Sequence, residues 1–305
     1  MNAAALWGGF FASAPVQTAL VVGGFVAAVA GVVGVFTVVR GQSFAGHALA
    51  DLGAVGGAAA FLLGIGQLAG FVGAGLIAAV AMEAIGLRRI QGRDVATGVV
   101  FGFGLGLTAL FLYLDTIWGK GSNATVSVLF GSLFVIDPAT VPVVVALSVV
   151  ALVLVLVVYR WLLMDSLGTE LAVAQRVPVR LAGIGFLVAL ALAVELSSMS
   201  IGATLSTALL IGPAATALRL TKRFGRAIGV AVAFGVAATW LGCLISYESY
   251  YWGAGGSSWP VSFCIVALVF AGYLGVRLGT FALRRHRERR AGVVGAVRLP
   301  DPAVA

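Results

Sequence analysis

The sequence predicts an all-α integral membrane protein with about nine transmembrane helices. Three observations lead to this prediction: 61% of the 305 residues are apolar, only 10% are charged, and the mean hydropathy is +1.10. A soluble domain carries about 25% charged residues because water must hydrate its surface. A chain with so little charge cannot cover itself in water, so its solvent must be lipid.

Nine apolar segments come close to the length of about 20 residues that a helix needs to cross the hydrocarbon core. They cover residues 16–39, 47–65, 68–87, 95–114, 139–159, 181–198, 201–218, 227–247 and 260–279. The 42 glycines agree with this prediction, because small residues let transmembrane helices pack closely. We therefore expect a single transmembrane domain over residues 1–283, followed by a basic, disordered cytoplasmic tail at residues 284–305.

The basic residues indicate the orientation of these spans. Of the 19 Lys and Arg residues, all except Lys120 lie in alternate connections or at or beyond the end of the ninth span. Cytoplasmic loops carry an excess of Lys and Arg, so the N-terminus is expected outside and the C-terminus in the cytoplasm. Because the net charge of +8 is spread over these loops, it does not indicate a nucleic-acid partner.

Two ionisable side chains in the second span form a candidate metal pair. His47 and Asp51 are four residues apart, so on a helix they share one face. A charge at the centre of the bilayer costs about 2.5–3.5 kcal/mol on insertion scales, so each one needs a reason. An imidazole and a carboxylate suit zinc, manganese or iron. The same spacing also fits a hydrogen-bonded packing pair without a metal.

Two glutamates lie in other spans. Glu195 is a candidate for the transport path, although a hydrogen bond to the serines that follow it would give it a structural role. Glu83 lies about one turn from Arg88 and Arg89, which favours a structural ion pair near the inner interface.

The sequence carries no signature of a soluble enzyme. It lacks the His-Glu-x-x-His, Gly-x-Ser-x-Gly and phosphate-loop motifs, so no catalytic residues are expected, and any ATPase would be a separate chain. The two cysteines, Cys243 and Cys264, lie in apolar runs without metal-ligand spacing and are interpreted as packing residues.

Four segments carry a family resemblance, in the order 34–49, 93–101, 130–132 and 206–217. The last reads Ser-Thr-Ala-Leu-Leu-Ile-Gly-Pro-Ala-Ala-Thr-Ala and is close to a known Ala-Leu-Leu-x-x-Pro-Ala-Ala-Thr-Ala signature. Over about residues 10–280 the chain therefore resembles the manganese/zinc/iron-type permease family of ABC importers.

The resemblance implies a type II ABC importer fold in the plasma membrane, with a divalent metal ion as cargo and no permanently bound cofactor. Its implied partners are cytosolic ATP-binding subunits, an extracytoplasmic metal-binding protein, and a second permease copy or paralogue. The family's ATPase-coupling loop matches residues 170–178, and Arg176 stands where the family usually has Gly. The matching positions are Glu170, Ala172, Ala174, Val177 and Pro178.

The candidate metal pair departs from the family pattern. The family commonly has an acid four residues before the histidine, and here that position is Ser43. We hypothesise that the carboxylate has moved one turn along the same helix face, to Asp51. The predicted spans place His47 and Asp51 near the inner end of one helix and Glu195 near the outer end of another.

A single site would therefore require a break in the second helix, for which Gly53, Gly56 and Gly57 provide the means. Without a break, the three side chains would be two stations on one path.

The predicted function is ATP-driven metal import by alternating access, with residues 115–138 and 246–259 as candidate docking loops for a delivery protein. The aromatic residues of the second loop also fit an outer membrane-interface belt. Two rivals remain. One is a secondary transporter with Asp51 and Glu195 as proton or sodium sites. The other is a membrane enzyme that uses His47 and Asp51 on a lipid-soluble substrate.

Overall fold

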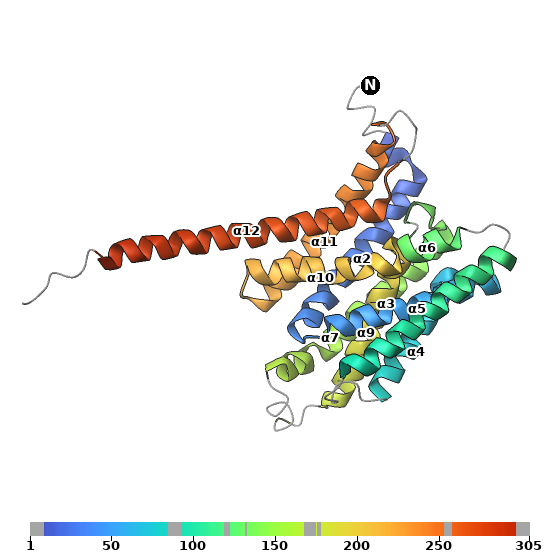
Figure 1. Cartoon of the computed structure of the whole chain (residues 1–305), viewed down its shortest axis with the longest axis horizontal. Helices are drawn as coiled ribbons and strands as arrows, with labels where there is room; N and C mark the ends of the chain where they lie inside the picture. Colours follow the sequence, from blue (N-terminus) through green and yellow to red (C-terminus); the bar gives the residue numbers. More distant parts are fainter. Residues whose placement is uncertain are drawn as a thin grey trace, which may run out of the picture.

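The chain is described by a computed structural model that places residues 9–84, 93–118, 123–131, 133–167, 175, 178–252 and 258–296. Its long helices are α2 (Ala14–Val39), α3 (Ser43–Leu63), α4 (Gln67–Ala84), α5 (Arg93–Trp118), α7 (Val141–Leu167), α9 (Val179–Ile201), α10 (Ala203–Leu220), α11 (Phe224–Ser249) and α12 (Val261–Ala296). A short helix, α6 (Ala124–Phe130), and two 3₁₀ turns, η1 (Leu133–Val135) and η2 (Pro138–Thr140), lie between α5 and α7 (Figure 1). The secondary structure of these placed residues is entirely helical.

Each predicted span coincides with one of the nine long helices. Within the described residues, eight helices are long and apolar enough to cross a membrane, and α4 contributes a shorter apolar stretch, Gln67–Glu83. The predicted all-helical, multi-pass class is therefore confirmed, whereas the count of nine spans stays a prediction.

Helices α2 and α9 form the centre of the bundle. Helix α2 packs against α7, α9, α10 and α11, and α9 packs against α3, α4, α7 and α10 as well. Small residues allow this close packing: a Cβ at Gly34 of α2 would overlap the carbonyl oxygen of Leu210 in α10. The signature segment 206–217 therefore lies on α10, whose backbone is in direct contact with the central helix α2.

Helices α5, α7 and α12 lie at the periphery. Their large apolar side chains, such as Phe103, Leu156 and Phe270, are well exposed on the protein surface. In a soluble protein this surface would be unfavourable, but lipid tails are as apolar as the side chains themselves. The outward faces of these helices are therefore suited to contact with lipid.

Helix α12 is much longer than the predicted ninth span. It has 36 residues, or about 54 Å at 1.5 Å per residue, and it projects well beyond the rest of the molecule (Figure 1). Helix α12 continues to Ala296, beyond the start of the tail expected at residues 284–305, and the disorder of that tail stays a prediction. The remaining residues of that tail lie outside the described part of the chain.

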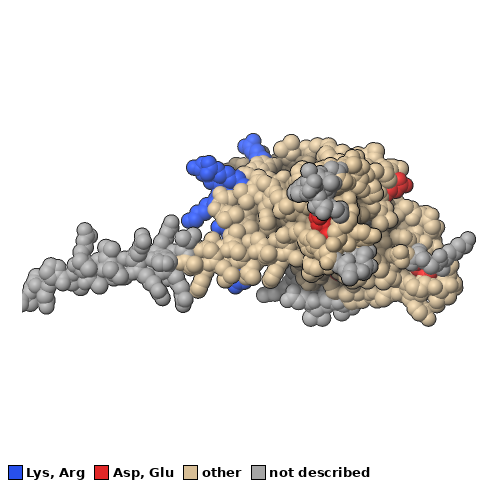
Figure 2. Space-filling view, turned by 90° about the horizontal axis from the view of Figure 1, so that it is seen from above, with Lys and Arg blue, Asp and Glu red and all other residues tan. Residues whose placement is uncertain are grey.

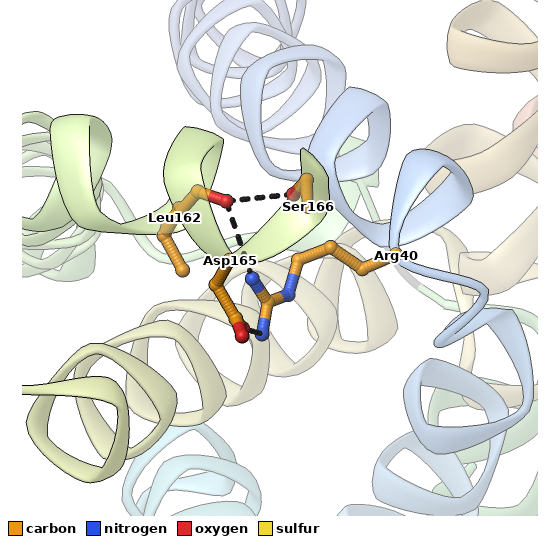
Figure 3. A network of polar contacts seen from close by, with 4 residues as sticks. All are labelled: Arg40, Leu162, Asp165 and Ser166. Atoms are coloured by element: carbon orange, nitrogen blue, oxygen red, sulfur yellow. Dashed lines mark hydrogen bonds and ion pairs between the residues drawn. The ribbon is translucent and has the colours of Figure 1, made fainter. Parts of the chain in front are cut away.

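The visible Lys and Arg side chains gather around the end of the molecule from which α12 projects, and the visible Asp and Glu lie away from it (Figure 2). At the end of α2, the Arg40 guanidinium forms an ion pair with Asp165 of α7, with 2.6 Å between Nη2 and Oδ2. Arg40 also donates to the Leu162 carbonyl, which accepts a hydrogen bond from Ser166 (Figure 3). The guanidinium lies 5.4 Å from the ring centroid of Phe186 in α9, so this one side chain links the end of α2 to two other helices, α7 and α9.

The candidate docking loop at residues 115–138 is more structured than the sequence indicates. Helix α5 continues to Trp118, and α6 packs against α3, α9 and α10. After α6, Gly131 (φ 77°) lies against Gly202 (φ 94°), the residue at which the chain turns from α9 into α10. A Cβ at either glycine would overlap the backbone of the other segment, so both the turn and the contact require glycine.

Candidate functional site

Helix α3 carries the predicted histidine and carboxylate on one face. The helix is unbroken from Ser43 to Leu63, and His47 Nε2 lies 3.9 Å from Asp51 Oδ2. This separation is too long for a hydrogen bond and fits a charge contact instead. The Asp51 residue is 3% exposed, whereas 41% of the His47 side chain is accessible. The pair therefore joins an open imidazole to a buried carboxylate.

Neither member of this pair has its polar atoms satisfied by the described residues. His47 Nδ1 and Asp51 Oδ2 are buried atoms without a hydrogen-bond partner. The imidazole ring packs against Phe101 of α5, with 5.2 Å between the ring centroids. Unpaired polar atoms in a buried position are costly unless another group binds them. The packing-pair alternative, which requires a hydrogen bond between the two side chains, is not seen.

Glu195 on α9 is completely buried, and both of its carboxylate oxygens lack a hydrogen-bond partner among the placed residues. The sequence offers a hydrogen bond to the following serines as a structural role. The structure shows a different arrangement, because the Ser197 hydroxyl donates to the Ala193 carbonyl, and the Ser198 hydroxyl has no partner. Glu195 therefore stands as a second unsatisfied buried carboxyl group.

Two glycines make the space that Glu195 occupies. A Cβ at Gly53 of α3 would overlap the carboxylate of Glu195, and a Cβ at Gly75 of α4 would overlap its side chain from the other direction. Gly53 is two residues from Asp51, and the carboxyl groups of Asp51 and Glu195 are close enough to interact electrostatically. The structure thus brings Asp51 and Glu195 together without a break in α3.

The break at Gly53, Gly56 or Gly57 that a single site would have required is not seen in α3. Gly56 lies against the carbonyl oxygen of Gly70 in α4, and Gly57 lies against the ring of Phe71. These residues let two helices approach closely and do not interrupt either of them.

The helix bounds differ from those of the predicted spans. Helix α3 begins at Ser43 and α9 ends at Ile201, whereas the predicted spans begin at residue 47 and end at residue 198. Asp51 and Glu195 therefore both lie further from the helix ends than apolar runs alone indicate.

The three residues form two pairs that share Asp51, and they do not form one compact cluster. In the part of the chain that the structure describes, no three His, Cys, Asp or Glu side chains lie together closely enough to hold a metal ion. A divalent ion bound by His47 and Asp51 would take one nitrogen and one oxygen ligand from this chain. The rest of its coordination would have to come from water or from another chain.

The other predicted residues lie elsewhere. Glu83 and Arg180 line a half-open cavity of about 560 Å³ between α4 and α9, while Arg88 and Arg89 lie outside the described residues. Of the coupling-loop residues, Glu170, Ala172, Ala174 and Val177 also lie outside them. Pro178 directly precedes α9.

Asp115 is a buried carboxylate that the sequence analysis missed. It lies in α5, is 3% exposed, and falls one residue beyond the predicted span of 95–114. A helix drawn to Trp118 would have included it among the intramembrane acids.

Replacing Gly53 with alanine is expected to displace the Glu195 carboxylate and to lower the thermal unfolding midpoint of the purified chain. The added methyl group overlaps the Glu195 carboxylate, and the same side chain lies against Gly75 of α4, so the carboxylate would have to shift from its place between the two helices. The double variant Gly53→Ala/Glu195→Ala should recover most of the loss. An unchanged midpoint in Gly53→Ala would contradict the described position of Glu195.

A bundle of apolar helices with unsatisfied carboxyl and imidazole groups inside it defines a multi-pass membrane transport protein. Residues 13–274 match the ABC 3 transport family, and the chain belongs to that family. It is accordingly an ABC transporter permease of the cell membrane.

Relatives over most of the chain support this assignment. The chain is 29% identical over 253 residues to the manganese import system permease protein ScaB of Streptococcus gordonii, covering 83% of this chain and 89% of that protein. It is 29% identical over 281 residues to the chelated iron transport system membrane protein YfeC of Yersinia pestis, covering 88% and 91%. Its fold is similar to a chain in the structure of PsaBC from Streptococcus pneumoniae in complex with Fab. That match has a TM-score of 0.77 and 28% sequence identity, and it covers 90% of this chain and 95% of that one.

Proposed function

We propose that this chain is the permease subunit of an ATP-driven importer of a divalent transition metal, with manganese or iron as the favoured cargo. The observation that carries the proposal is the pair of His47 and Asp51, with unsatisfied buried polar atoms on a transmembrane helix. Family membership supports the transport class, and the names of the relatives support manganese and iron.

The donor atoms agree with this cargo. An imidazole nitrogen with carboxylate oxygens suits manganese, iron and zinc, whereas a soft monovalent copper ion prefers sulfur ligands. In the proposed orientation His47 lies nearer the inner end of α3, so its accessible imidazole would stand on the inner side of the buried Asp51, which supplies negative charge. Glu195 adds a second carboxyl group deeper in the bundle. A second permease copy and water would complete the coordination.

Movement of the ion would follow alternating access. Cytosolic ATP-binding subunits would act through residues 170–178, which directly precede α9, the helix that carries Glu195. An extracytoplasmic metal-binding protein would dock near residues 246–259, where Tyr250, Tyr251, Trp252 and Trp259 are all about half exposed or more. This orientation places the N-terminus outside and the long α12 extension in the cytoplasm.

Asp51→Asn and His47→Ala are each expected to lower metal accumulation by about tenfold or more, since the loss of a supporting ligand commonly costs 10–100-fold in metal affinity. The measurement is inductively coupled plasma mass spectrometry of manganese, iron and zinc in a bacterial host that lacks its own importers. The host expresses the permease together with its ATP-binding and delivery subunits, at matched membrane levels.

Asp137→Asn is the matched control. This substitution makes the same chemical change as Asp51→Asn, but at an exposed position. The Asp137 side chain caps η2 by accepting a hydrogen bond from the Ala139 N–H, and asparagine can accept the same bond. Full and metal-selective uptake in Asp51→Asn would contradict the proposed path. Uptake that persists without the ATP-binding subunit would show secondary transport instead.

A further inference from the structure

We propose that Cys243 and Cys264 are an oxidisable dithiol, which closes to a disulfide that joins α11 to α12. They are the only two cysteines of the chain, and the structure holds both as buried free thiols. From the sequence alone they are interpreted as packing residues. Their arrangement in the fold indicates a modification site.

The backbones that carry the two cysteines are in direct contact. A Cβ at Gly242 would lie 2.9 Å from the nitrogen and 3.0 Å from the Cα of Ile265. The peptide bond between Cys264 and Ile265 therefore packs against the residue that precedes Cys243. The two sulfur-bearing groups are also close enough to interact electrostatically. A disulfide needs Cα atoms within about 7 Å, and this close helix crossing favours such a distance.

The neighbouring connection fixes the ends of the two helices against each other. The Ser246 hydroxyl donates to the Trp259 carbonyl at 2.6 Å, and the Trp259 N–H donates to the Ser249 hydroxyl at 2.8 Å. Cys243 lies one turn before Ser246, and Cys264 lies in the first turn of α12. The two cysteines therefore lie within about one helical turn of the hydrogen-bonded connection between α11 and α12. These hydrogen bonds hold the adjoining ends of the two helices together.

The position of the pair also favours oxidation. In the orientation of the proposed function, on which this step rests, the α11–α12 connection faces the extracytoplasmic side. Disulfides form and persist on that side of a cell membrane, whereas cytosolic thiols are kept reduced. Among the described residues no third His, Cys, Asp or Glu joins the two thiols, so a metal site is not indicated.

Hydrogen peroxide, a small uncharged oxidant, suits a buried pair. One cysteine attacks the peroxide, the O–O bond breaks, and a sulfenic acid and one water form. The second thiol then attacks the sulfenic sulfur, the S–O bond breaks, and the disulfide and a second water form. Both cysteines lose their hydrogen and two electrons pass to the peroxide, so the step balances. Because the thiols are buried, we expect the reaction to be slower than that of an exposed thiol.

The test uses the purified chain in mild detergent. The chain is treated with hydrogen peroxide, then denatured, and its remaining free thiols are labelled with a maleimide reagent. The number of labelled thiols is expected to fall from two to near zero in the natural chain. Each of Cys243→Ala and Cys264→Ala should form no internal cross-link. No Lys or Arg lies between residues 226 and 277, so digestion after aromatic residues is needed to separate the two cysteines. The linked peptides should then appear in the natural chain with a mass two hydrogens lower than their sum.

Two outcomes would overturn the proposal. One is two labelled thiols that persist under peroxide conditions that fully oxidise an exposed thiol in the same tube. The other is a disulfide that joins separate chains, seen as a doubled mass on a non-reducing gel. The linked-peptide measurement on the natural chain needs no variant, so poor folding of a variant does not affect it. The assay does not measure metal uptake, so its result can be told apart from the result of the uptake experiment that tests the proposed function.

Discussion

Replacing Gly70 with alanine is expected to remove most of the correctly folded protein, while Gly73→Ala on the same helix is expected to be tolerated. A Cβ at Gly70 would overlap the carbonyl oxygen of Gly56 and lie 2.6 Å from the Cβ of Ala60. A Cβ at Gly73 meets no atom within 4 Å. The two substitutions are chemically identical and differ only in what the added methyl group contacts.

The expected loss of stability in Gly70→Ala depends on which atoms the added methyl group would overlap. The obstruction at Gly70 is backbone, which cannot rotate aside, so α3 and α4 would have to separate. Overpacking of this kind costs about 1–3 kcal/mol, and we expect the upper end of that range. Alanine is about 1 kcal/mol better than glycine in a helix interior, so Gly73→Ala should be neutral or slightly stabilising.

Fluorescence-detected size-exclusion chromatography and thermal unfolding in detergent would measure both variants at equal expression. Gly70→Ala should lower the unfolding midpoint by several degrees or leave only aggregate, and Gly73→Ala should match the natural chain. Equal midpoints for the two variants would show that α3 and α4 do not cross at the Gly56–Gly70 contact.

Breaking the Arg40–Asp165 pair is expected to have an effect of similar size. The two side chains are only 6% and 8% exposed, so Arg40→Ala removes the cation that pairs with the buried Asp165 carboxylate. Removing one partner of a buried ion pair costs about 3–5 kcal/mol. Arg40 also stacks on Phe186 and donates to Leu162, so its loss would loosen α2, α7 and α9 together.

The double variant Arg40→Leu/Asp165→Leu separates charge from packing. It removes both charges and keeps apolar volume, so its unfolding midpoint should be higher than that of either single variant. Arg219→Ala is the control: its guanidinium also stacks on a ring and contacts the Tyr273 hydroxyl, but it is exposed. We expect that control to cost under about 1 kcal/mol. A double variant less stable than both single variants would contradict this account.

Arg40 and the candidate metal pair lie close together in the chain, with only the short turn at residues 40–42 between α2 and α3. Helix α9 also contacts both regions, through Phe186 near Arg40 and through Glu195 near Asp51. Arg40 therefore connects the ends of α2 and α7 to α9, which carries Glu195, at a point next to the start of α3. A rigid support of this kind is what a binding site needs to hold its ligands in place.

The family and the membrane class could be predicted from the sequence because they depend on composition and on local motifs. Low charge, apolar runs of about 20 residues and the segment ending in Pro-Ala-Ala-Thr-Ala are visible without any fold. The proximity of His47 and Asp51 could also be predicted, because two residues four positions apart on a helix lie on the same face.

The tertiary structure alone decided how Glu195 relates to that pair. Glu195 follows Asp51 by 144 positions in the chain (195 minus 51), and its place depends on how α9 crosses α3 and α4. That crossing is set by glycines at Gly53 and Gly75, whose missing side chains are indistinguishable in the sequence from the other glycines. The close approach of α11 and α12 beside Cys243 and Cys264 is decided in the same way, at Gly242. Helix formation follows from local chemistry, whereas helix crossing follows from which small residues meet, and only the packed bundle determines that.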